Sequence, residues 1–274
     1  MEYFFSRLPE ITRRLNQAAA AALLLDFDGT LSPIAATPGR ATLPEATRNE
    51  LKNISAVLPM AVISGRALRD IKNKVRVKNI IYAGNHGLEW SMGGKSGAAA
   101  AAKKAARPLA AAKRRLMILK RKYPGMLIED KGLALAIHYR RLGARDAGPF
   151  KKALNEIFAP FAKGRLTITK GKKVMELRSN TDWNKGKFVL FLENYFTKKF
   201  RQKPLLVYIG DDVTDEDAFA ALSDGIAIRV GRKQRSRARY YIKNQSQVPR
   251  LLAWFAHKLA SQKNRHTNNF ISPK

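Results

Sequence analysis

Short apolar runs that break off in glycine, serine or acidic residues recur in the first and last thirds of the chain. Each run is too short for a helix and apolar on both faces, which predicts a strand buried within a sheet. Strand and helix patterns alternate through residues 20–85 and resume after residue 184, so the sequence predicts an α/β fold with a Rossmann-like parallel sheet. The predicted strands are Leu23–Leu25, Ala61–Ile63, Ile80–Gly84, Leu205–Ile209 and Gly225–Val230, and a last helix lies near Val248–Leu259.

The pattern changes in the middle of the chain. Two apolar runs flank a turn at Asp130-Lys131-Gly132 and predict a hairpin, a helical pattern follows, and two further strands flank a turn at Gly171. Pro108 suits the first turn of a helix that ends near Tyr123, whereas the alanine run at 98–102 suits either a linker or a helix. The hairpin strands are Met126–Glu129 and Leu133–Tyr139, the helix is Phe150–Ala162, and the later strands are Arg165–Thr169 and Val174–Arg178.

This block of two strands, a helix and two strands interrupts the alternating pattern. We therefore expect a small α+β domain inserted into the parallel-sheet core, and we interpret it as a cap. The expected division is a core formed by residues 1–102 and 181–260, a cap at residues 103–180, and a polar tail at residues 261–274 that is predicted to be disordered.

Composition narrows the class of protein. No apolar run approaches the roughly 18–20 residues of a membrane span, so we expect no membrane span. The apolar stretch Ala18–Leu25 leads directly into an acidic segment, and its removal as a signal peptide would destroy the first core strand, which favours a cytoplasmic protein. The absence of cysteine excludes disulfides, thiolate catalysis and zinc–sulfur sites.

The charge is strongly positive, with a formal net charge of +31. About half of the excess lies in the predicted cap, where residues 103–178 hold 21 Lys and Arg against 5 Asp and Glu. Such a field would steer a small dianion such as a sugar phosphate. It also raises the alternative of nucleic-acid or anionic-membrane binding, for which the basic run at 231–241 is the best support. Because the sequence shows no nucleic-acid-binding motif, we expect binding to polyanions to be incidental.

Candidate chemistry begins where the first strand ends. Asp26 and Asp28 follow Leu25 with a spacing of two, so their carboxylates point the same way at the sheet edge where α/β proteins bind ligands. Converging carboxylates suit a hard cation such as Mg²⁺ and a nucleophile paired with an acid. The alternative is an acidic loop after a buried strand.

The strand at Leu205–Ile209 also ends in acid. Five carboxylates lie between Asp211 and Asp217, and so many like charges need a cation or hydrogen bonds to stay together. An acidic helix start would explain the last three of them, because Asp and Glu favour a first turn. It explains Asp211 less well, because that residue directly follows the strand.

Two further segments suit a phosphate group. Ser64, Gly65 and Arg66 follow a predicted strand and offer a hydroxyl, a backbone N–H and a guanidinium. Lys185 lies at the start of an amphipathic helical segment, with Lys187 as a competing candidate.

These four segments, in this order, resemble the haloacid dehalogenase superfamily of phosphotransferases. The resemblance implies that Asp26 is the nucleophile, Asp28 the general acid/base, and that Ser64 and Lys185 bind the phosphoryl group. It further implies Mg²⁺ held by the Asp26 carboxylate, the Asp28 carbonyl and Asp211, with Asp215 in or near a second layer of contacts. The neighbouring residues expected at the substrate are Gly29, Thr30, Gly65 and Arg66.

Further motifs resemble one family within that superfamily, the trehalose-6-phosphate phosphatases. They are Asn85-His86-Gly87-Leu88-Glu89, Leu135–Arg140, Lys172–Arg178 and the acidic segment Gly210–Asp217. The resemblance implies that the cap grips the sugar through Glu129, Lys131, Arg140, Lys172 and Glu176, and the core through Asn85, His86 and Gly87. Lys173 competes with Lys172, and His138 is expected to be packed. Ser179 departs from the family, which often has proline there.

Taken together, the sequence predicts a Mg²⁺-dependent phosphatase of trehalose biosynthesis that hydrolyses trehalose 6-phosphate through an aspartyl-phosphate. The enzymatic alternative is a related capped phosphatase for sucrose phosphate or a glycosyl-3-phosphoglycerate. A nucleic-acid-binding protein built on a phosphatase fold is the remaining alternative, and the intact acidic segments speak against it.

Overall fold

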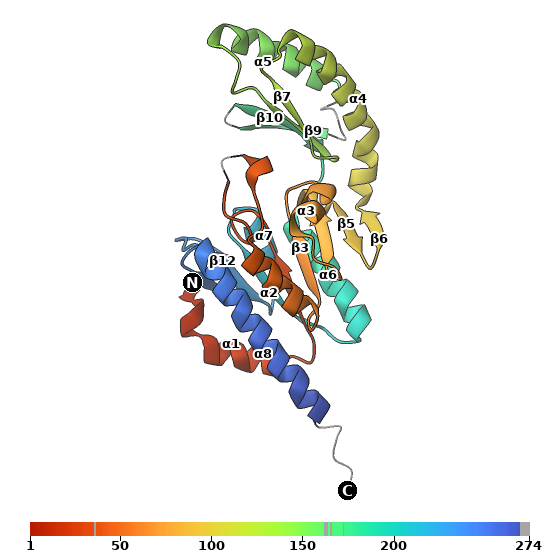
Figure 1. The fold of residues 1–274 in the computed structure, drawn as a ribbon. Helices are drawn as coiled ribbons and strands as arrows, with labels where there is room; N and C mark the ends of the chain where they lie inside the picture. Colours follow the sequence, from red (N-terminus) through yellow and green to blue (C-terminus); the bar gives the residue numbers. More distant parts are fainter. Residues whose placement is uncertain (36, 162–163, 165, 172, 269–274) are drawn as a thin grey trace. The chain divides into compact units, whose positions relative to one another are not determined.

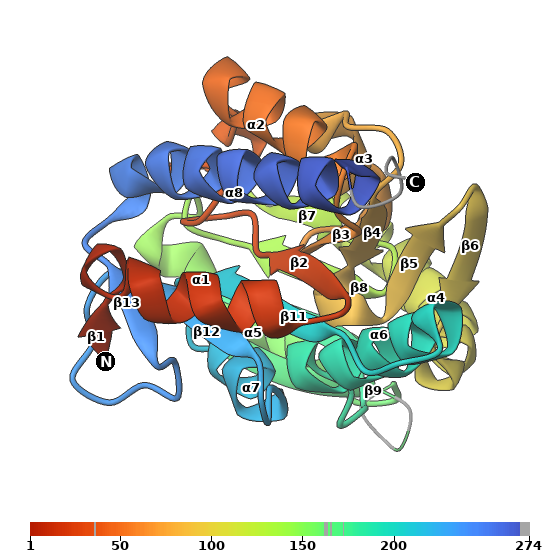
Figure 2. The same ribbon diagram turned by 90° about the horizontal axis from the view of Figure 1, so that it is seen from below.

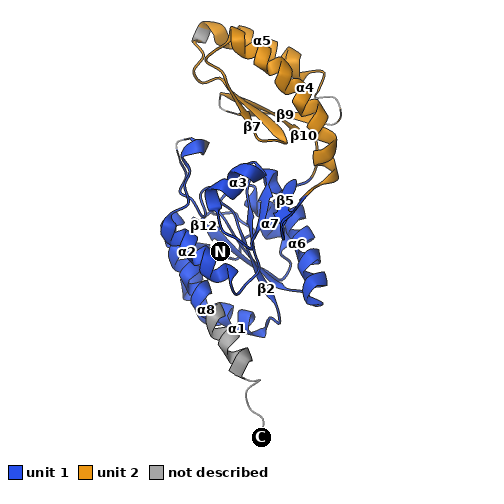
Figure 3. Cartoon of the chain, turned by 45° about the vertical axis from the view of Figure 1, so that its right-hand side comes forward, with its two compact units in different colours: residues 1–96, 183–274 blue, residues 97–182 orange. Residues whose placement is uncertain are grey.

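A computed structural model describes residues 1–35, 37–161, 164, 166–171 and 173–268 of the 274-residue chain. The chain divides into two compact units (Figure 3). Unit 1 comprises Met1–Ser96 and Trp183–Lys274, and unit 2 comprises Gly97–Asp182. Among the described residues, no helix is long and apolar enough to cross a membrane.

Unit 1 is built on a nine-stranded sheet (Figure 1), in which the strand order is β1-β13-β12-β11-β2-β3-β4-β5-β6. All described pairs from β1 to β4 are parallel, and β5 pairs antiparallel with β4. The strands are β1 (Glu2–Tyr3), β2 (Ala21–Leu25), β3 (Met60–Ile63), β4 (Ile81–Gly84), β5 (Glu89–Met92), β6 (Lys95–Ala98), β11 (Leu205–Gly210), β12 (Ile226–Val230) and β13 (Tyr240–Ile242).

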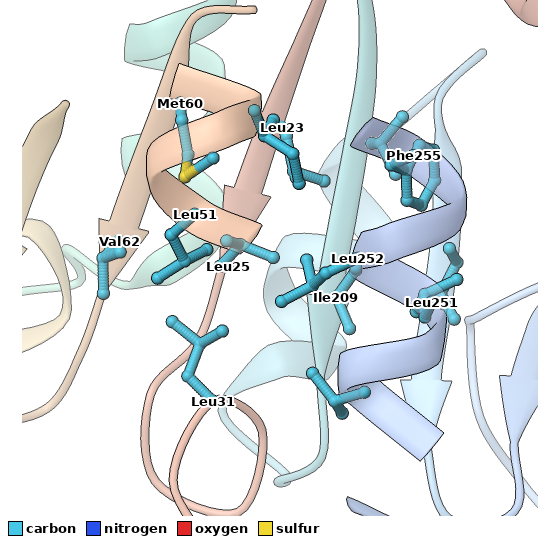
Figure 4. Close-up of a cluster of buried hydrophobic side chains, with 14 of the residues drawn as sticks. Leu23, Leu25, Leu31, Leu51, Met60, Val62, Ile209, Leu251, Leu252 and Phe255 are labelled. Atoms are coloured by element: carbon cyan, nitrogen blue, oxygen red, sulfur yellow. The ribbon is translucent and has the colours of Figure 1, made fainter. Parts of the chain in front are cut away.

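Helices cover both faces of this sheet (Figure 2). Alternate residues of β2 separate the two cores: Leu23 and Leu25 join the first apolar cluster, and Ala22 and Leu24 the second. The first cluster includes α1 (Leu8–Gln17), α2 (Glu45–Ser55), α3 (Leu68–Val75) and α8 (Val248–Asn268), and part of it is drawn in Figure 4. The second cluster includes α6 (Lys185–Phe200) and α7 (Asp215–Ala221). Short 3₁₀ turns lie at η1 (Phe4–Ser6), η2 (Pro38–Arg40), η3 (Asn85–Gly87) and η4 (Gln245–Gln247).

Unit 2 has its own four-stranded antiparallel sheet, with the order β7-β8-β10-β9, and its own apolar core. Ile137 and Met175 are directly opposite each other in the sheet and both belong to that core. The elements are α4 (Ala100–Lys122), β7 (Leu127–Asp130), β8 (Ala134–His138), α5 (Ala144–Phe158), β9 (Leu166–Gly171) and β10 (Val174–Ser179).

The predicted α/β class is confirmed, but one local prediction is wrong. Pro108 lies inside α4, not in its first turn, because the preceding alanines favour a helix strongly and Ala102 and Ala105 are buried on its inner face. The glycine-rich segment before α4, where the two units meet in sequence, forms a hairpin that the sequence did not predict, and Gly93 and Gly94 join β5 to β6 at positive φ.

The last helix also extends further than the sequence predicted. α8 continues to Asn268, beyond the expected end near Leu259. Residues 269–274 of the predicted disordered tail lie outside the described residues.

Candidate active site

The parallel register brings four strand ends together at one sheet edge. Leu25, the last residue of β2, is opposite Ile209 in β11 and Val62 in β3. Asp26 follows at once, and its N–H donates to the Ile209 carbonyl at 2.9 Å. Asp26 is therefore fixed by the sheet and buried, whereas the side chain of Asp28 is 43% exposed.

The ammonium of Lys185 lies between two buried carboxylates. Its Nζ donates to Oδ1 of Asp26 at 2.6 Å and to Oδ1 of Asp215 at 2.7 Å. The position follows from the helix start, because the side chain of Asn184 caps α6 by accepting from the Lys187 N–H. Lys187 itself is exposed, so the structure brings Lys185 and not its competitor to Asp26.

Asp215 organises the acidic loop from inside the protein. One of its oxygens accepts from Lys185 and from the Tyr208 hydroxyl at 2.7 Å. The other accepts from the backbone N–H groups of Asp211 and Asp212 at 3.0 and 2.9 Å. Four bonds occupy the roughly four lone-pair sites of a carboxylate. Asp215 is therefore committed to holding its neighbours.

Asp211 is placed by the loop that carries Asp28. The hydroxyl of Thr30 donates to Oδ1 of Asp211 at 3.1 Å. Gly29 has φ +83°, and a Cβ atom there would lie 2.1 Å from Oδ2 of Asp211. The glycine thus lets the second acidic loop approach the first. The N–H of Gly29 donates to the Ser32 carbonyl, and the N–H of Thr30 donates to the Phe27 carbonyl. These hydrogen bonds lie within the loop and hold its shape.

Burial and like charges perturb these groups. Burial, partly offset by the charge of Lys185, raises the pKa of Asp26 well above its ordinary value. Burial and the charge of Asp215 raise the pKa of Asp211 to about 6. Burial opposes the charge on Lys185, but attraction to Asp26 and Asp215 outweighs it and raises the pKa of that ammonium. Protonation or a bound cation would relieve this cost of holding negative charge in a buried site.

This donor set suits a divalent cation. Asp26, Asp211 and Asp215 each have an oxygen within 4.8 Å of the others, and Asp26 and Asp211 are the better candidates because the oxygens of Asp215 already accept four hydrogen bonds. Oxygen donors alone, with excess negative charge, are the ligands that Mg²⁺ prefers.

The segment after β3 is also at this edge. Ser64 is buried, and its Oγ accepts from the Arg66 N–H at 3.2 Å. Gly65 lies against the ring of His86, where a Cβ atom would be 2.8 Å from Cε1. The guanidinium of Arg66 is already paired with an acidic group, because it donates to both oxygens of Asp28 at 2.6 and 2.7 Å.

The segment after β4 is held by Glu89, the last residue of the Asn85–Glu89 motif, to which the sequence assigned no role of its own. Oε1 of Glu89 accepts from the buried Asn85 amide and from the Leu68 N–H, each at 2.8 Å. Gly87 has φ +91°, and a Cβ atom there would lie 2.4 Å from Cβ of Phe188. The contacts described for Asn85 and Gly87 therefore fix the turn against α3 and α6.

In unit 2, several predicted sugar contacts share one face of the sheet. Glu129 in β7 and Glu176 in β10 lie on either side of β8, and both are opposite Ala136 of that strand. Their side chains therefore lie on the same face of the sheet. Lys131 is 3.6 Å from Glu176. Arg140 lies just beyond β8 and is exposed, and Lys172 lies outside the described residues.

The expected packing of His138 is wrong. Its side chain is 36% exposed, and its Nε2 is 2.9 Å from Oε2 of Glu129. The reason is strand alternation: Ile137 takes the core side of β8, so His138 faces the other side with Glu129.

Sequence reasoning also missed Tyr208 and Arg229. Tyr208 reads as an ordinary apolar strand residue, although its hydroxyl reaches Asp215. Arg229 reads as a lone charge in a strand, although its guanidinium donates to the carbonyls of Asp211 and Asp212 and to Glu216 at 3.0 Å. A single polar side chain within an apolar strand gives only a weak signal, which here was that Tyr208 and Arg229 each interrupt a buried strand with a polar group.

Comparison with known proteins agrees with this geometry. A sequence model of the family described as trehalose-phosphatase matches residues 24–249. Trehalose-phosphate phosphatase B of Arabidopsis thaliana is 30% identical over 265 residues, covering 90% of this chain and 70% of the relative. Trehalose-phosphate phosphatase of Mycobacterium tuberculosis is 33% identical over 222 residues, covering 78% of this chain and 56% of the relative.

Solved structures share the fold. The C-terminal domain of a Candida albicans trehalose-6-phosphate phosphatase has a TM-score of 0.69 at 24% identity, covering 91% of this chain and 96% of that one. A trehalose-6-phosphate phosphatase related protein has a TM-score of 0.73 at 22% identity, covering 88% and 99%. By the family match and the identity to curated relatives, the chain belongs to the trehalose-phosphatase family of phosphomonoester hydrolases.

Proposed function

We propose that the protein hydrolyses trehalose 6-phosphate to trehalose and phosphate, with Asp26 as the nucleophile and Mg²⁺ as the cofactor. The observation that carries the proposal is the buried Asp26 carboxylate, bound by Lys185 at 2.6 Å and grouped with Asp211 at the carboxyl end of the sheet, in a chain of this family. The family gives the substrate, because relatives of this chain are named for trehalose phosphate.

The first half-reaction forms a bond between Asp26 and phosphorus and breaks the bond between phosphorus and the sugar oxygen. Asp28 gives that oxygen a proton, and trehalose leaves. In the second half-reaction Asp28 takes a proton from water, the oxygen of which attacks phosphorus, and the bond to Asp26 breaks. The pair of carboxylates thus works as a nucleophile and a general acid/base.

Lys185 supports the attack by a carboxylate on an anion. Its ammonium touches Asp26, so it lowers the repulsion between two negative groups as they approach. The hydroxyl of Ser64, at the neighbouring strand end, would donate to a phosphoryl oxygen. Both assignments follow the roles expected from the sequence.

The oxygen ligands for Mg²⁺ would be the carboxylates of Asp26 and Asp211 and the backbone carbonyl of Asp28. Asp215 would support them from behind, because its oxygens already accept from Lys185, Tyr208 and the loop backbone. When bound, the cation would neutralise phosphoryl charge and favour the ionised form of Asp26.

The sugar would be held by Glu129, Lys131, Arg140 and Glu176 of unit 2, acting as a cap, with Lys172 as a further candidate. Charged groups make stronger hydrogen bonds to hydroxyls than neutral groups do, which suits a polar disaccharide. Asn85 and His86 are the candidates from unit 1. A cytoplasmic location and incidental binding to polyanions stay predictions from the sequence, and no contact described above supports the second.

Phosphate release across a panel of sugar phosphates tests the proposal. The panel is trehalose 6-phosphate, sucrose 6-phosphate, glucosyl-3-phosphoglycerate and glucose 6-phosphate, each with Mg²⁺ and with EDTA. We expect kcat/KM to be highest for trehalose 6-phosphate and activity to stop in EDTA. A clear preference for another ester would reassign the substrate, and full activity without metal would remove Mg²⁺ from the proposal.

A further inference from the structure

The edge of the Arg66 guanidinium formed by Nε and Nη2, which can bind a carboxylate or phosphate through two parallel hydrogen bonds, is occupied by Asp28. Its Nε and Nη2 donate to the two oxygens of Asp28 at 2.7 and 2.6 Å. Such a parallel pair of bonds fixes the plane of a carboxyl group as well as its position. The side chain of Arg66 is only 9% exposed, so the pair is sheltered from water on the arginine side.

Arg66 is in turn held by its surroundings. Its Nη1 donates to Oδ2 of Asp70, in the first turn of α3, at 2.8 Å. Its Cζ lies 5.4 Å from the ring centroid of Phe27, the buried residue between Asp26 and Asp28. Its backbone N–H and carbonyl are bonded too, to Ser64 and Asn85. An arginine with this many fixed contacts is preorganised.

We propose that Arg66 and Asp70 are positioning residues, which hold the carboxyl group of Asp28 where it gives a proton to the leaving sugar oxygen and takes one from the attacking water. Asp70 acts through Arg66, and Arg66 acts through Asp28. The proposal rests on the acid/base role proposed for Asp28. It differs from the role expected from the sequence, in which Arg66 contacts the phosphoryl group.

The two possible roles of Arg66, positioning Asp28 or contacting the phosphoryl group, predict different effects of an Arg66 substitution on esters with different leaving groups. A sugar alkoxide leaves poorly and needs the proton of Asp28, whereas p-nitrophenolate leaves without one. The ratio kcat/KM covers substrate binding and the steps up to departure of the alcohol, so of the two roles of Asp28 it reports the acid role and not the base role. A misaligned Asp28 therefore slows trehalose 6-phosphate more than p-nitrophenyl phosphate. Loss of a phosphoryl contact slows both.

The test compares Asp70→Asn and Arg66→Lys with the wild type and with Arg69→Lys, a matched change at an exposed position of α3. Lysine keeps the charge but cannot form the two parallel bonds. General acid catalysis is worth roughly 10²–10⁴-fold, so partial misalignment should lower kcat/KM for trehalose 6-phosphate by about tenfold or more. We expect little change for p-nitrophenyl phosphate, for inhibition by inorganic phosphate or trehalose, or in Arg69→Lys.

Equal losses on both esters, together with weaker inhibition by phosphate, would overturn the proposal and assign Arg66 to the phosphoryl group. Wild-type behaviour in Asp70→Asn would remove Asp70 as the anchor. Weaker inhibition by trehalose would move the effect to sugar binding and also overturn it. A wild-type protein that does not hydrolyse trehalose 6-phosphate would contradict the proposed function itself, which separates the two failures.

Discussion

At the scale of single residues, the stability of the site depends on the balance between its buried carboxylates and the cation that lies between them. Lys185 is the buried cation between Asp26 and Asp215, and its side chain is only 2% exposed. A buried charge that loses its partner is costly, because no water replaces the lost contact. Lys185 therefore has a structural effect as well as the role proposed for it in catalysis.

Replacing Lys185 with methionine should destabilise the metal-free protein. The change leaves two buried carboxylates without their ammonium, and breaking a buried pair in this way costs about 3–5 kcal/mol. Lys187→Met, two residues along α6 at an exposed position, is the matched control and should change little. Urea unfolding in EDTA measures both. Equal midpoints for Lys185→Met and the wild type would contradict the described contacts.

Much of the site could be predicted residue by residue, because the acids follow directly after strong strand patterns. Asp26 and Asp211 are examples, because each directly follows a strand, and the strand fixes the position of the residue that comes next. The roles of Tyr208, Arg229 and Glu89 could not be predicted, because they depend on which other segments the side chains contact in the fold. That information lies in strand order and register and not in local pattern.

At the scale of elements, the acidic loop after β11 is braced from both sides. Asp215 holds its backbone N–H groups, and Arg229 of β12 holds its carbonyls and Glu216. Glu216 also accepts from the Arg237 N–H at 2.7 Å, which ties in the following loop. The loop therefore presents Asp211 from a well-bonded base, as the proposed metal site would require.

Changes along this loop should separate metal binding from general acidity. Asp211→Ala should weaken Mg²⁺ binding strongly, because it removes a proposed ligand. Asp217→Ala should have little effect, because Asp217 is exposed on α7. Calorimetric titration of Mg²⁺ into each variant gives the affinities, and Mg²⁺ should raise the melting temperature of the wild type by mass action. Equal affinities in the two variants would exclude Asp211 as a ligand.

The fold could be predicted where the pattern is repetitive and not where it is irregular. Parallel strands buried on both faces give unmistakable apolar runs, such as Leu205–Ile209. The β5–β6 hairpin was missed because its glycine-rich sequence also fits a linker. The start of α4 was missed because Pro108 suits a first turn, and only the burial of Ala102 and Ala105 shows why the helix begins earlier.

At the scale of the whole molecule, chemistry and recognition are assigned to different units. The carboxylates and Lys185 belong to unit 1, and the proposed sugar contacts Glu129, Arg140 and Glu176 belong to unit 2. Binding energy from a remote sugar can align the phosphoryl group and help exclude water. Substrate preference should therefore change without loss of the core chemistry.

Glu176→Ala and Arg140→Ala test that separation. Loss of one charge-assisted contact, about 1.5–3 kcal/mol, should lower kcat/KM for trehalose 6-phosphate roughly 10- to 150-fold. Hydrolysis of p-nitrophenyl phosphate should stay near the wild-type rate, because that ester has no sugar to hold. Arg141→Ala, next to Arg140 and also exposed, is the control. Equal losses on both esters would show that these residues support the fold or the core site instead.

The most direct test of the account is to trap the covalent intermediate. The wild type, Asp26→Asn and Asp217→Asn are mixed with trehalose 6-phosphate and Mg²⁺, quenched within milliseconds, and digested for peptide mass spectrometry. The account predicts a hydroxylamine-sensitive phosphoryl group on Asp26 in the wild type and in Asp217→Asn. It predicts neither phosphopeptide nor phosphate release in a folded Asp26→Asn protein. Substantial phosphate release by that folded variant would contradict nucleophilic attack by Asp26.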